Sequence, residues 1–294
     1  KFTAPLSTGM AASIVIGQPD FATASAGSGT TKMSGPNDIA FDSSGNIWVA
    51  DANNNRMLKF TAPLSTGMAA SVVIGQPDFT TVTSGNGAIK MTFPYRVVLD
   101  SSGNLLVVDT NNNRVLKFTA PLSTGMAASV VIGQTGFLAS DTFSGIGNNK
   151  MNGPAGVALD SSGNLLVADN TNHRVLKFSA PLTTGMAAST VIGQPDFVTF
   201  TSGSGTTKMK NPEGVALDSS GNLLVADVSN NRVLKFLTTP TSNFGSQVTN
   251  NVTILSTCGL SVISGSPVSF GSLFTGATST EQTLVLDNTG SIPA

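Results

Sequence analysis

Aspartate and arginine recur together at one spacing along this sequence of 294 residues. Each aspartate ends a short apolar run, and an arginine follows it across a four-residue loop. The pairs are Asp51 and Arg56, Asp109 and Arg114, Asp169 and Arg174, and Asp227 and Arg232. Four carboxylates on equivalent loops could line a ligand site, but a charge-assisted pair repeated in every unit is typical of a structural staple. We therefore expect each aspartate to accept hydrogen bonds from its arginine and from loop amides.

Other residue patterns that support catalysis or cofactor binding are missing from the sequence. His173 is the only histidine, so a zinc site built from several imidazoles is excluded. The single cysteine, Cys258, excludes an intrachain disulfide and a cysteine metal cluster. No serine stands in a nucleophile motif, and no phosphate loop or dinucleotide fingerprint is present. On these grounds we expect no cofactor, with calcium as the one exception considered below.

The staple pairs belong to an internal repeat, in which the dipeptide Lys-Phe recurs at intervals of 58, 58, 60 and 58 residues. In one repeat, the apolar runs 214–218 and 223–227 flank the turn sequence SSGN, and RVLKF follows at 232–236. A β-branched run supplies a fourth strand candidate at 13–17, 71–75, 129–133 and 189–193. Four antiparallel strands per repeat predict an all-β fold, a β-propeller of four-stranded blades. A solenoid of stacked sheets is the alternative.

The segment GVALDSSGNLLVADNTNHRVLKF at 156–178 resembles the NHL repeat. The resemblance extends to 36–60, 94–118 and 212–236. The segment VIGQPDF, with the long loop after it, is similar to the extended NHL repeats of bacterial extracellular proteins, which implies an extracellular or cell-surface location. His173 matches the histidine of the repeat signature, so we expect a structural role for it. The other repeats carry asparagine there, as Asn55, Asn113 and Asn231.

The repeat region, 1–236, is expected to form the propeller. Either the run at 13–17 completes the blade begun at 212–236 and closes a ring of about four blades, or the blades are an open arc of a larger ring. The start of the sequence inside a repeat favours a missing N-terminal part. Residues 237–258 have the composition of a linker. Residues 259–294 resemble the first strands of an Ig-like β-sandwich of the ASPM-SPD-2-Hydin type, and they are too few to close a sandwich core.

Five charged residues of the propeller region fall outside the repeat pattern, namely Asp38, Arg96, Asp141, Lys210 and Glu213. Asp38, Arg96 and Glu213 lie at or beside one position, just after the proline that opens the first strand of a unit, and Asn37 and Tyr95 lie there as well. The first strand of each propeller blade lines the central channel, so equivalent positions lie at equal radius around one axis. We therefore predict that a ligand binds at this channel mouth, where Tyr95 offers an aromatic ring with a polar tip.

The charge balance and the hydropathy of the sequence limit the kinds of partner that the protein can bind. The sequence has 15 basic and 16 acidic residues, which gives no excess of positive charge for nucleic acid. No apolar stretch is long enough for membrane insertion. We predict a non-catalytic binding or scaffolding module of a secreted or cell-surface multidomain protein, with a protein or glycan as its ligand. The alternative is a calcium-dependent enzyme resembling propeller lactonases or lyases, with Asn37, Asp38 and Glu213 as oxygen ligands.

Overall fold

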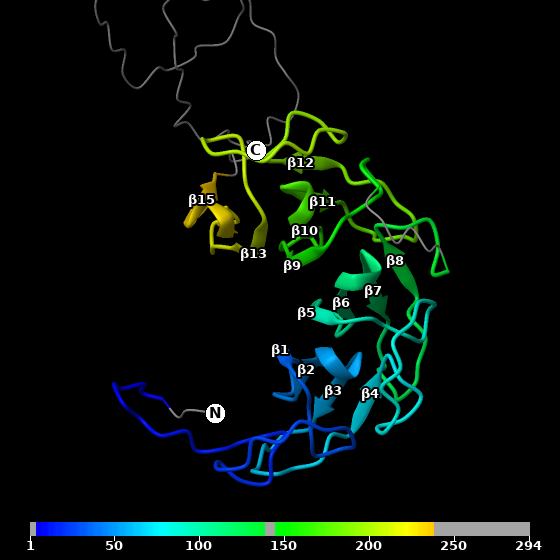
Figure 1. Ribbon diagram of the computed structural model, residues 1–294, viewed down its shortest axis with the longest axis vertical. Helices are drawn as coiled ribbons and strands as arrows, with labels where there is room; N and C mark the ends of the chain where they lie inside the picture. The colour runs from blue at the N-terminus through cyan, green and yellow to red at the C-terminus, as the bar shows by residue number, and fades with distance from the viewer. Residues whose placement is uncertain (1–3, 139–144, 238–294) are drawn as a thin grey trace, which may run out of the picture. The chain divides into compact units, whose positions relative to one another are not determined.

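The computed structural model describes residues 4–138 and 145–237, and these residues form four antiparallel sheets (Figure 1). Blade 1 contains β1 (Pro36–Phe41), β2 (Ile47–Asp51), β3 (Arg56–Phe60) and β4 (Val72–Ile74). Blade 2 contains β5 (Pro94–Leu99), β6 (Leu105–Asp109), β7 (Arg114–Phe118) and β8 (Val130–Ile132). Blade 3 contains β9 (Pro154–Leu159), β10 (Leu165–Asp169), β11 (Arg174–Phe178) and β12 (Thr190–Ile192). Blade 4 contains β13 (Pro212–Leu217), β14 (Leu223–Asp227) and β15 (Arg232–Phe236).

The prediction of an all-β fold built from propeller blades is confirmed. The helical segments among the described residues are three-residue 3₁₀ turns, η1 (Ala52–Asn54), η2 (Thr110–Asn112), η3 (Asn170–Asn172) and η4 (Val228–Asn230). No helix in this part of the chain has the length and hydropathy to cross a membrane. The predicted linker beyond residue 237 and the predicted sandwich start at 259–294 lie outside the described residues.

Two local turns convert the short apolar runs into hairpins. Between β1 and β2, the carboxylate of Asp42 accepts hydrogen bonds from the backbone amides of Ser44 and Asn46, both at 3.0 Å. Gly45 in this turn has a φ of 77°, a left-handed conformation that glycine adopts without a steric penalty. Between β2 and β3, the turn η1 ends at Asn55, whose φ is 54°. Each blade repeats both turns, so strand order within a blade follows sequence order.

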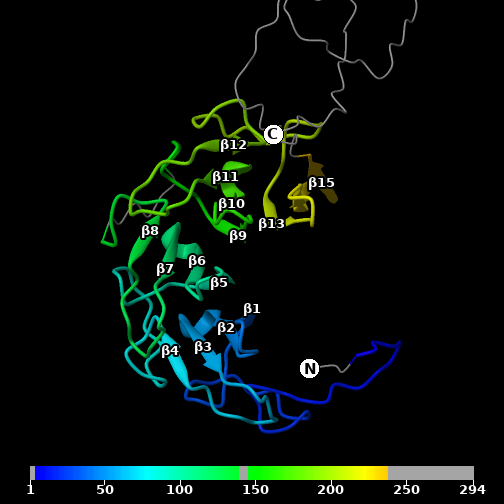
Figure 2. The same ribbon diagram turned by 180° about the vertical axis from the view of Figure 1, so that it is seen from behind.

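The blades lie side by side along an arc, with β1, β5, β9 and β13 on its concave side and β4 and β8 on its convex side (Figures 1 and 2). Neighbouring blades share apolar cores. Between blades 1 and 2, Trp48 and Met57 are fully buried in one cluster with Leu116 and Phe118. Successive side chains along a strand point to opposite faces of its sheet, and each face packs against a neighbouring blade.

The prediction of a strand at 13–17 is wrong. This run forms no strand, and blade 4 has three strands there, so 13–17 does not complete it. An outer strand forms by pairing with the third strand of its own blade, as β4 pairs with β3. The described residues contain no third strand of a blade to which 13–17 would belong.

Each blade contains an ion pair at the end of its second strand, and the pair is fully buried in blades 1 to 3. In blade 2, Asp109 and Arg114 are both inaccessible to solvent, and the arginine Nε donates to the carboxylate at 2.7 Å. The same carboxylate accepts hydrogen bonds from the backbone amide of Thr92 at 2.7 Å and from the side chain of Asn112 at 2.9 Å. Burial raises the pKa of Asp109, and the paired arginine acts in the opposite direction.

The arginine of this pair joins loops that are distant in the sequence. Arg114 donates further hydrogen bonds to three backbone oxygens, at 2.8 to 3.0 Å. The acceptors are Gly87, Lys90 and Phe137. Gly87 and Lys90 belong to the long loop that leads into β5, and Phe137 follows β8. One guanidinium therefore fixes the loop before its blade, the loop after it and the hairpin between them.

Asp109→Ala should lower the free energy of unfolding by about 3 kcal/mol or more, because it leaves the buried Arg114 charge without its counterion. Blade 4 provides a matched control, since the side chain of Arg232 is 28% exposed and water can solvate it. Asp227→Ala should therefore lower the free energy of unfolding by clearly less than Asp109→Ala. Urea denaturation followed by circular dichroism measures both. Equal losses in the two variants would show that burial of the pair is not the source of the effect.

Candidate functional site

The position that breaks the repeat is a β-bulge at the start of each first strand. In blade 1, Pro36 pairs with Asp51 but Asp38 pairs with Ala50, so Asn37 is the extra residue. Blade 2 and blade 4 have the same irregularity, at Tyr95 and at Glu213. Blade 3 also shifts register in this place. A bulge increases local twist and re-aims the side chain that it carries. Each first strand on the concave side therefore begins with a re-aimed residue that differs in all four repeats.

Four of the five predicted ligand-binding residues lie together, on the adjacent strands β1 and β5. The Nη1 atom of Arg96 donates to the backbone oxygen of Asn37 at 3.2 Å and lies 3.9 Å from the carboxylate of Asp38. Asp38 also accepts a hydrogen bond from the backbone amide of Val97 at 2.9 Å. The guanidinium carbon of Arg96 lies 4.9 Å from the centre of the Tyr95 ring. The Arg96 and Asp38 side chains remain 32% and 25% exposed, so the cluster is open to a ligand.

The structure adds Phe93, which the sequence analysis missed. Its ring stacks on Tyr95 with centroids 6.2 Å apart and an interplanar angle of 19°. Its φ is 57°, a left-handed conformation that is a genuine outlier for a bulky residue. The other repeats carry Gly35, Gly153 and Asn211 here, all with positive φ. The signal was therefore present in the sequence, as a phenylalanine at a position that otherwise holds residues tolerant of this conformation.

Glu213 lies apart from this cluster, on β13 of blade 4. Its backbone oxygen faces β9, where a Cβ atom on Gly156 would lie only 2.3 Å from it. The first strands of blades 3 and 4 therefore approach closely because Gly156 has no side chain. The three residues considered for calcium, Asn37, Asp38 and Glu213, thus come from the first and the fourth blade. The described residues contain no group of three or more His, Cys, Asp or Glu side chains placed to hold a metal ion.

His173 ends the turn η3 with a φ of 56° and lies between two blades. Its Nδ1 atom accepts a hydrogen bond of 3.2 Å from the backbone amide of Asn211. Asn113 makes the equivalent contact in the preceding blade, where its side-chain oxygen accepts from the amide of Gly153 at 2.8 Å. The imidazole therefore substitutes for an asparagine side chain. Burial lowers the pKa of His173 from 6.5, and the positive charge of Lys210 adds to this effect.

Comparison with protein families agrees with this architecture. The NHL repeat family matches residues 33–60, 91–118, 151–178 and 209–236, which are the three inner strands of each blade and the residues just before them. A search of curated proteins found no match.

Three solved structures are similar to this chain over part of their length. A streptogramin B lyase is 15% identical, with a TM-score of 0.45 over 71% of this chain and 54% of that chain. A virginiamycin B lyase from Staphylococcus aureus is 12% identical, with a TM-score of 0.44 over 73% of this chain and 59% of its own. An auxiliary nutrient binding protein from Bacteroides thetaiotaomicron is 15% identical, with a TM-score of 0.48 over 70% and 48%. This chain thus spans about half the length of these proteins, and the likeness concerns the fold.

His173→Asn should remove a pH dependence of stability. Because the folded pKa of His173 lies below its value of 6.5 in the unfolded chain, the unfolded chain takes up a proton more readily. The contribution of this residue is complete above pH 6.5 and is lost as the pH falls through the folded pKa. Urea midpoints between pH 7.5 and 5 should fall more steeply for the wild type than for His173→Asn. Asn113→His, at the equivalent position, should make the fall steeper. Parallel curves for all three proteins would contradict this assignment.

Proposed function

We propose that this chain of four NHL repeats is a non-catalytic binding or scaffolding module that recognises a protein or glycan at the channel mouth. The observation that carries the proposal is the cluster of Asp38, Phe93, Tyr95 and Arg96 on the mouths of blades 1 and 2. These residues depart from the repeat at the start of the first strand, each contacts another member of the cluster, and they remain partly exposed.

The chemistry of the cluster suits a polar partner with an apolar face. Tyr95 contacts both the Phe93 ring and the Arg96 guanidinium, and these two contacts restrict its orientation before a ligand arrives. A rigid aromatic residue with a polar tip contributes contact area at a low cost in conformational entropy. Asp38 and Arg96 place opposite charges side by side, which favours a neutral or zwitterionic ligand over a polyanion.

The left-handed backbone at Phe93 supports the same proposal. A side chain in this conformation costs about 1–2 kcal/mol relative to the ordinary regions, and such strain concentrates at binding sites. Glycine or asparagine at this position in the other blades shows that the fold itself does not require phenylalanine. A ligand-binding role for the ring accounts for its presence.

We further propose that the module acts outside the cell or on its surface, as the resemblance to extended repeats of such proteins suggests. Limited proteolysis of intact cells followed by immunoblotting tests this location. A chain that is degraded only after cell lysis would contradict it.

The variant Tyr95→Ala with Arg96→Gly should weaken ligand binding strongly while the fold is kept. It copies the Ala155–Gly156 pair of blade 3, so both residues are already compatible with this bulge. Glycan and peptide arrays identify a ligand, and titration calorimetry then compares the proteins. We expect at least a 10-fold loss of affinity. The control is Ser101→Ala with Ser161→Ala, in the turns at the opposite ends of β5 and β9. If binding survives the first change and is lost in the control, the ligand binds at the opposite ends of β5 and β9, and the proposed site is wrong.

Phe93→Asn separates binding from stability. Asparagine occupies the equivalent position at Asn211 with a φ of 50°, so relief of strain should offset the lost ring contact. We expect the free energy of unfolding to stay within about 0.5 kcal/mol of the wild type, with ligand affinity reduced several-fold. A large loss of stability with unchanged affinity would make Phe93 a packing residue. Addition of calcium should leave the melting temperature of both proteins unchanged, and a calcium-dependent rise would favour the enzymatic alternative.

A further inference from the structure

The outer strands β4 and β8 are each held from outside by a turn of the following repeat. The backbone amide of Val73 on β4 donates to Thr124 Oγ1 at 3.3 Å, and the amide of Gly125 donates to the backbone oxygen of Val73 at 3.0 Å. Blade 2 repeats both contacts at 3.3 and 3.1 Å, through Val131, Thr184 and Gly185. We call each Thr–Gly pair a clip. The clips satisfy backbone groups that an edge strand otherwise leaves open to pairing with another strand.

A methionine sulfur closes the turn that carries each clip. The amide of Met126 donates to the backbone oxygen of Ser123 at 3.3 Å, and the amide of Ser123 donates to the Sδ atom of Met126 at 3.4 Å. The same two bonds, at 3.3 to 3.4 Å, join Ser65 with Met68 and Thr183 with Met186. The two residues of a clip lie between these partners. The sulfur therefore helps to fix the position from which the clip reaches the preceding blade.

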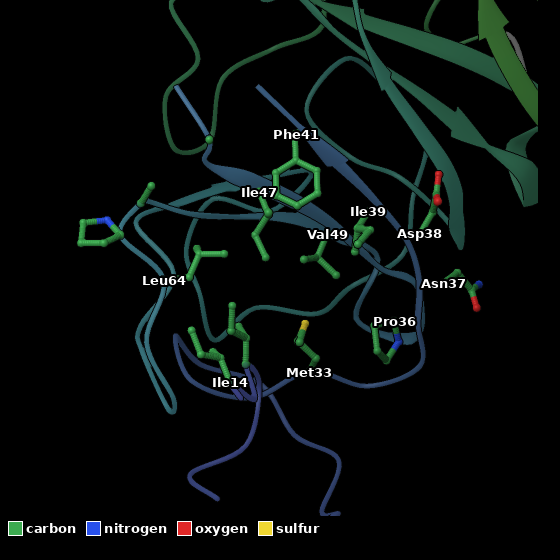
Figure 3. Close-up of a pocket in the computed structure, with 14 residues that line it drawn as sticks. Ile14, Met33, Pro36, Asn37, Asp38, Ile39, Phe41, Ile47, Val49 and Leu64 are labelled. Atoms are coloured by element: carbon green, nitrogen blue, oxygen red, sulfur yellow. The ribbon is translucent and has the colours of Figure 1, made fainter. Parts of the chain in front are cut away.

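The methionines of the clip turns lie near solvent, whereas a second set in the same chain is sealed from it. Met126 and Met186 are half-buried, each packed on an apolar cluster between two blades. Met91 and Met151 are 0% and 1% exposed, and the methyl group of each packs against a glycine that has no room for a Cβ atom. Met33, at the corresponding position of the first repeat, is half-buried and lines a pocket (Figure 3). Met91 and Met151 thus provide protected thioethers for comparison.

We propose that Met68, Met126 and Met186 are sites of sulfoxide formation by peroxides, and that oxidation releases the clip from the preceding blade. A sulfur lone pair attacks one oxygen of hydrogen peroxide, and the oxygen–oxygen bond breaks as the sulfur–oxygen bond forms. The leaving hydroxide takes the proton of the transferred oxygen and becomes water. The sulfur loses two electrons and the peroxide gains them. The product is a polar side chain that sulfoxide reductases return to methionine.

A sulfoxide does not fit the clip turn. Its oxygen projects beyond the sulfur, so the hydrogen-bond acceptor moves away from the point at which the Ser123 amide meets Sδ. The polar group also has to leave the apolar cluster against which Met126 packs, because burial of a polar group without a partner is costly. Both effects displace Met126 from the turn, and the clip residues lose the anchor that follows them. The outward backbone groups of β4 then become open to water or to another strand.

Peptide mapping by mass spectrometry during exposure to dilute hydrogen peroxide gives the order of oxidation. In the folded chain we expect Met126 and Met186 to be oxidised about 10-fold faster than Met91 and Met151, because exposure governs this reaction. The four rates should become similar in urea. Equal rates in the folded chain would overturn the assignment of these sites.

Amide hydrogen exchange at Val73 and Val131, followed by nuclear magnetic resonance, tests the release of the clips. Oxidation of the wild type should speed exchange at both amides several-fold, and sulfoxide reductases should restore the slow rates. Met126→Leu keeps an apolar side chain that peroxide does not oxidise. After peroxide treatment, Val73 of this variant should exchange as before treatment, while exchange at Val131 still rises. Met186→Leu should give the reverse, so each clip is the control for the other.

A polar substitution separates release of the clip from general oxidative damage. Met126→Gln places a permanent polar group in the turn, so it should speed exchange at Val73 without peroxide and leave Val131 unchanged. Exchange at Val73 that does not respond to oxidation overturns the proposal. An equal rise at Val73 in Met126→Leu and the wild type also overturns it, and so does wild-type exchange in Met126→Gln. The clips adjoin β4 and β8 on the convex side (Figures 1 and 2), so these outcomes do not depend on ligand binding at the channel mouth.

Discussion

The ion pair at the end of each second strand is the constraint on which the rest of the structure depends. Removing two charges from water is costly, and the cost is recovered only when geometry and additional hydrogen bonds are good. Here the carboxylate of Asp109 has three donors, and Arg114 reaches three further backbone oxygens. The long polar loops have few apolar residues of their own, so these bonds fix their course and thereby the point at which each first strand begins.

That starting point determines the candidate site. The backbone amide of Thr92, which Asp109 binds, directly precedes Phe93 and the bulge that presents Tyr95. The left-handed residue of the preceding blade holds the same segment from the other side, because the side chain of Asn55 accepts a hydrogen bond from the amide of Phe93. The start of β5 is thus held by two hydrogen bonds from different blades, which explains how its residues can vary without loss of position.

Much of the fold could be predicted because the relevant signals are local and repeated. Alternating apolar runs, the SSGN turn and the Asp–Arg spacing each act within a few residues, and four copies remove ambiguity. The strand expected at 13–17 failed because strand formation needs a neighbouring strand, which a propensity for β structure does not provide. The only sign of Phe93 in the sequence is a phenylalanine where the other repeats have glycine or asparagine, and its stacking on Tyr95 required the folded backbone. The cluster of Asp38 with Arg96 followed from repeat symmetry, whereas the separation of Glu213 from it required the arrangement of the blades.

The near-identity of the blade faces has a consequence for folding fidelity. Specific recognition requires that the right partner bind better than the wrong one, yet blades 2, 3 and 4 offer closely similar side chains on the same face, with alanine in place of valine at two positions of blades 3 and 4. Complementarity therefore cannot tell one neighbour from another. The order of the blades is enforced instead by the tether, because the next repeat in the chain has by far the highest effective concentration at a newly formed face. Synthesis from the N-terminus, one repeat at a time, adds a temporal filter in which each blade meets its correct neighbour before any competitor exists.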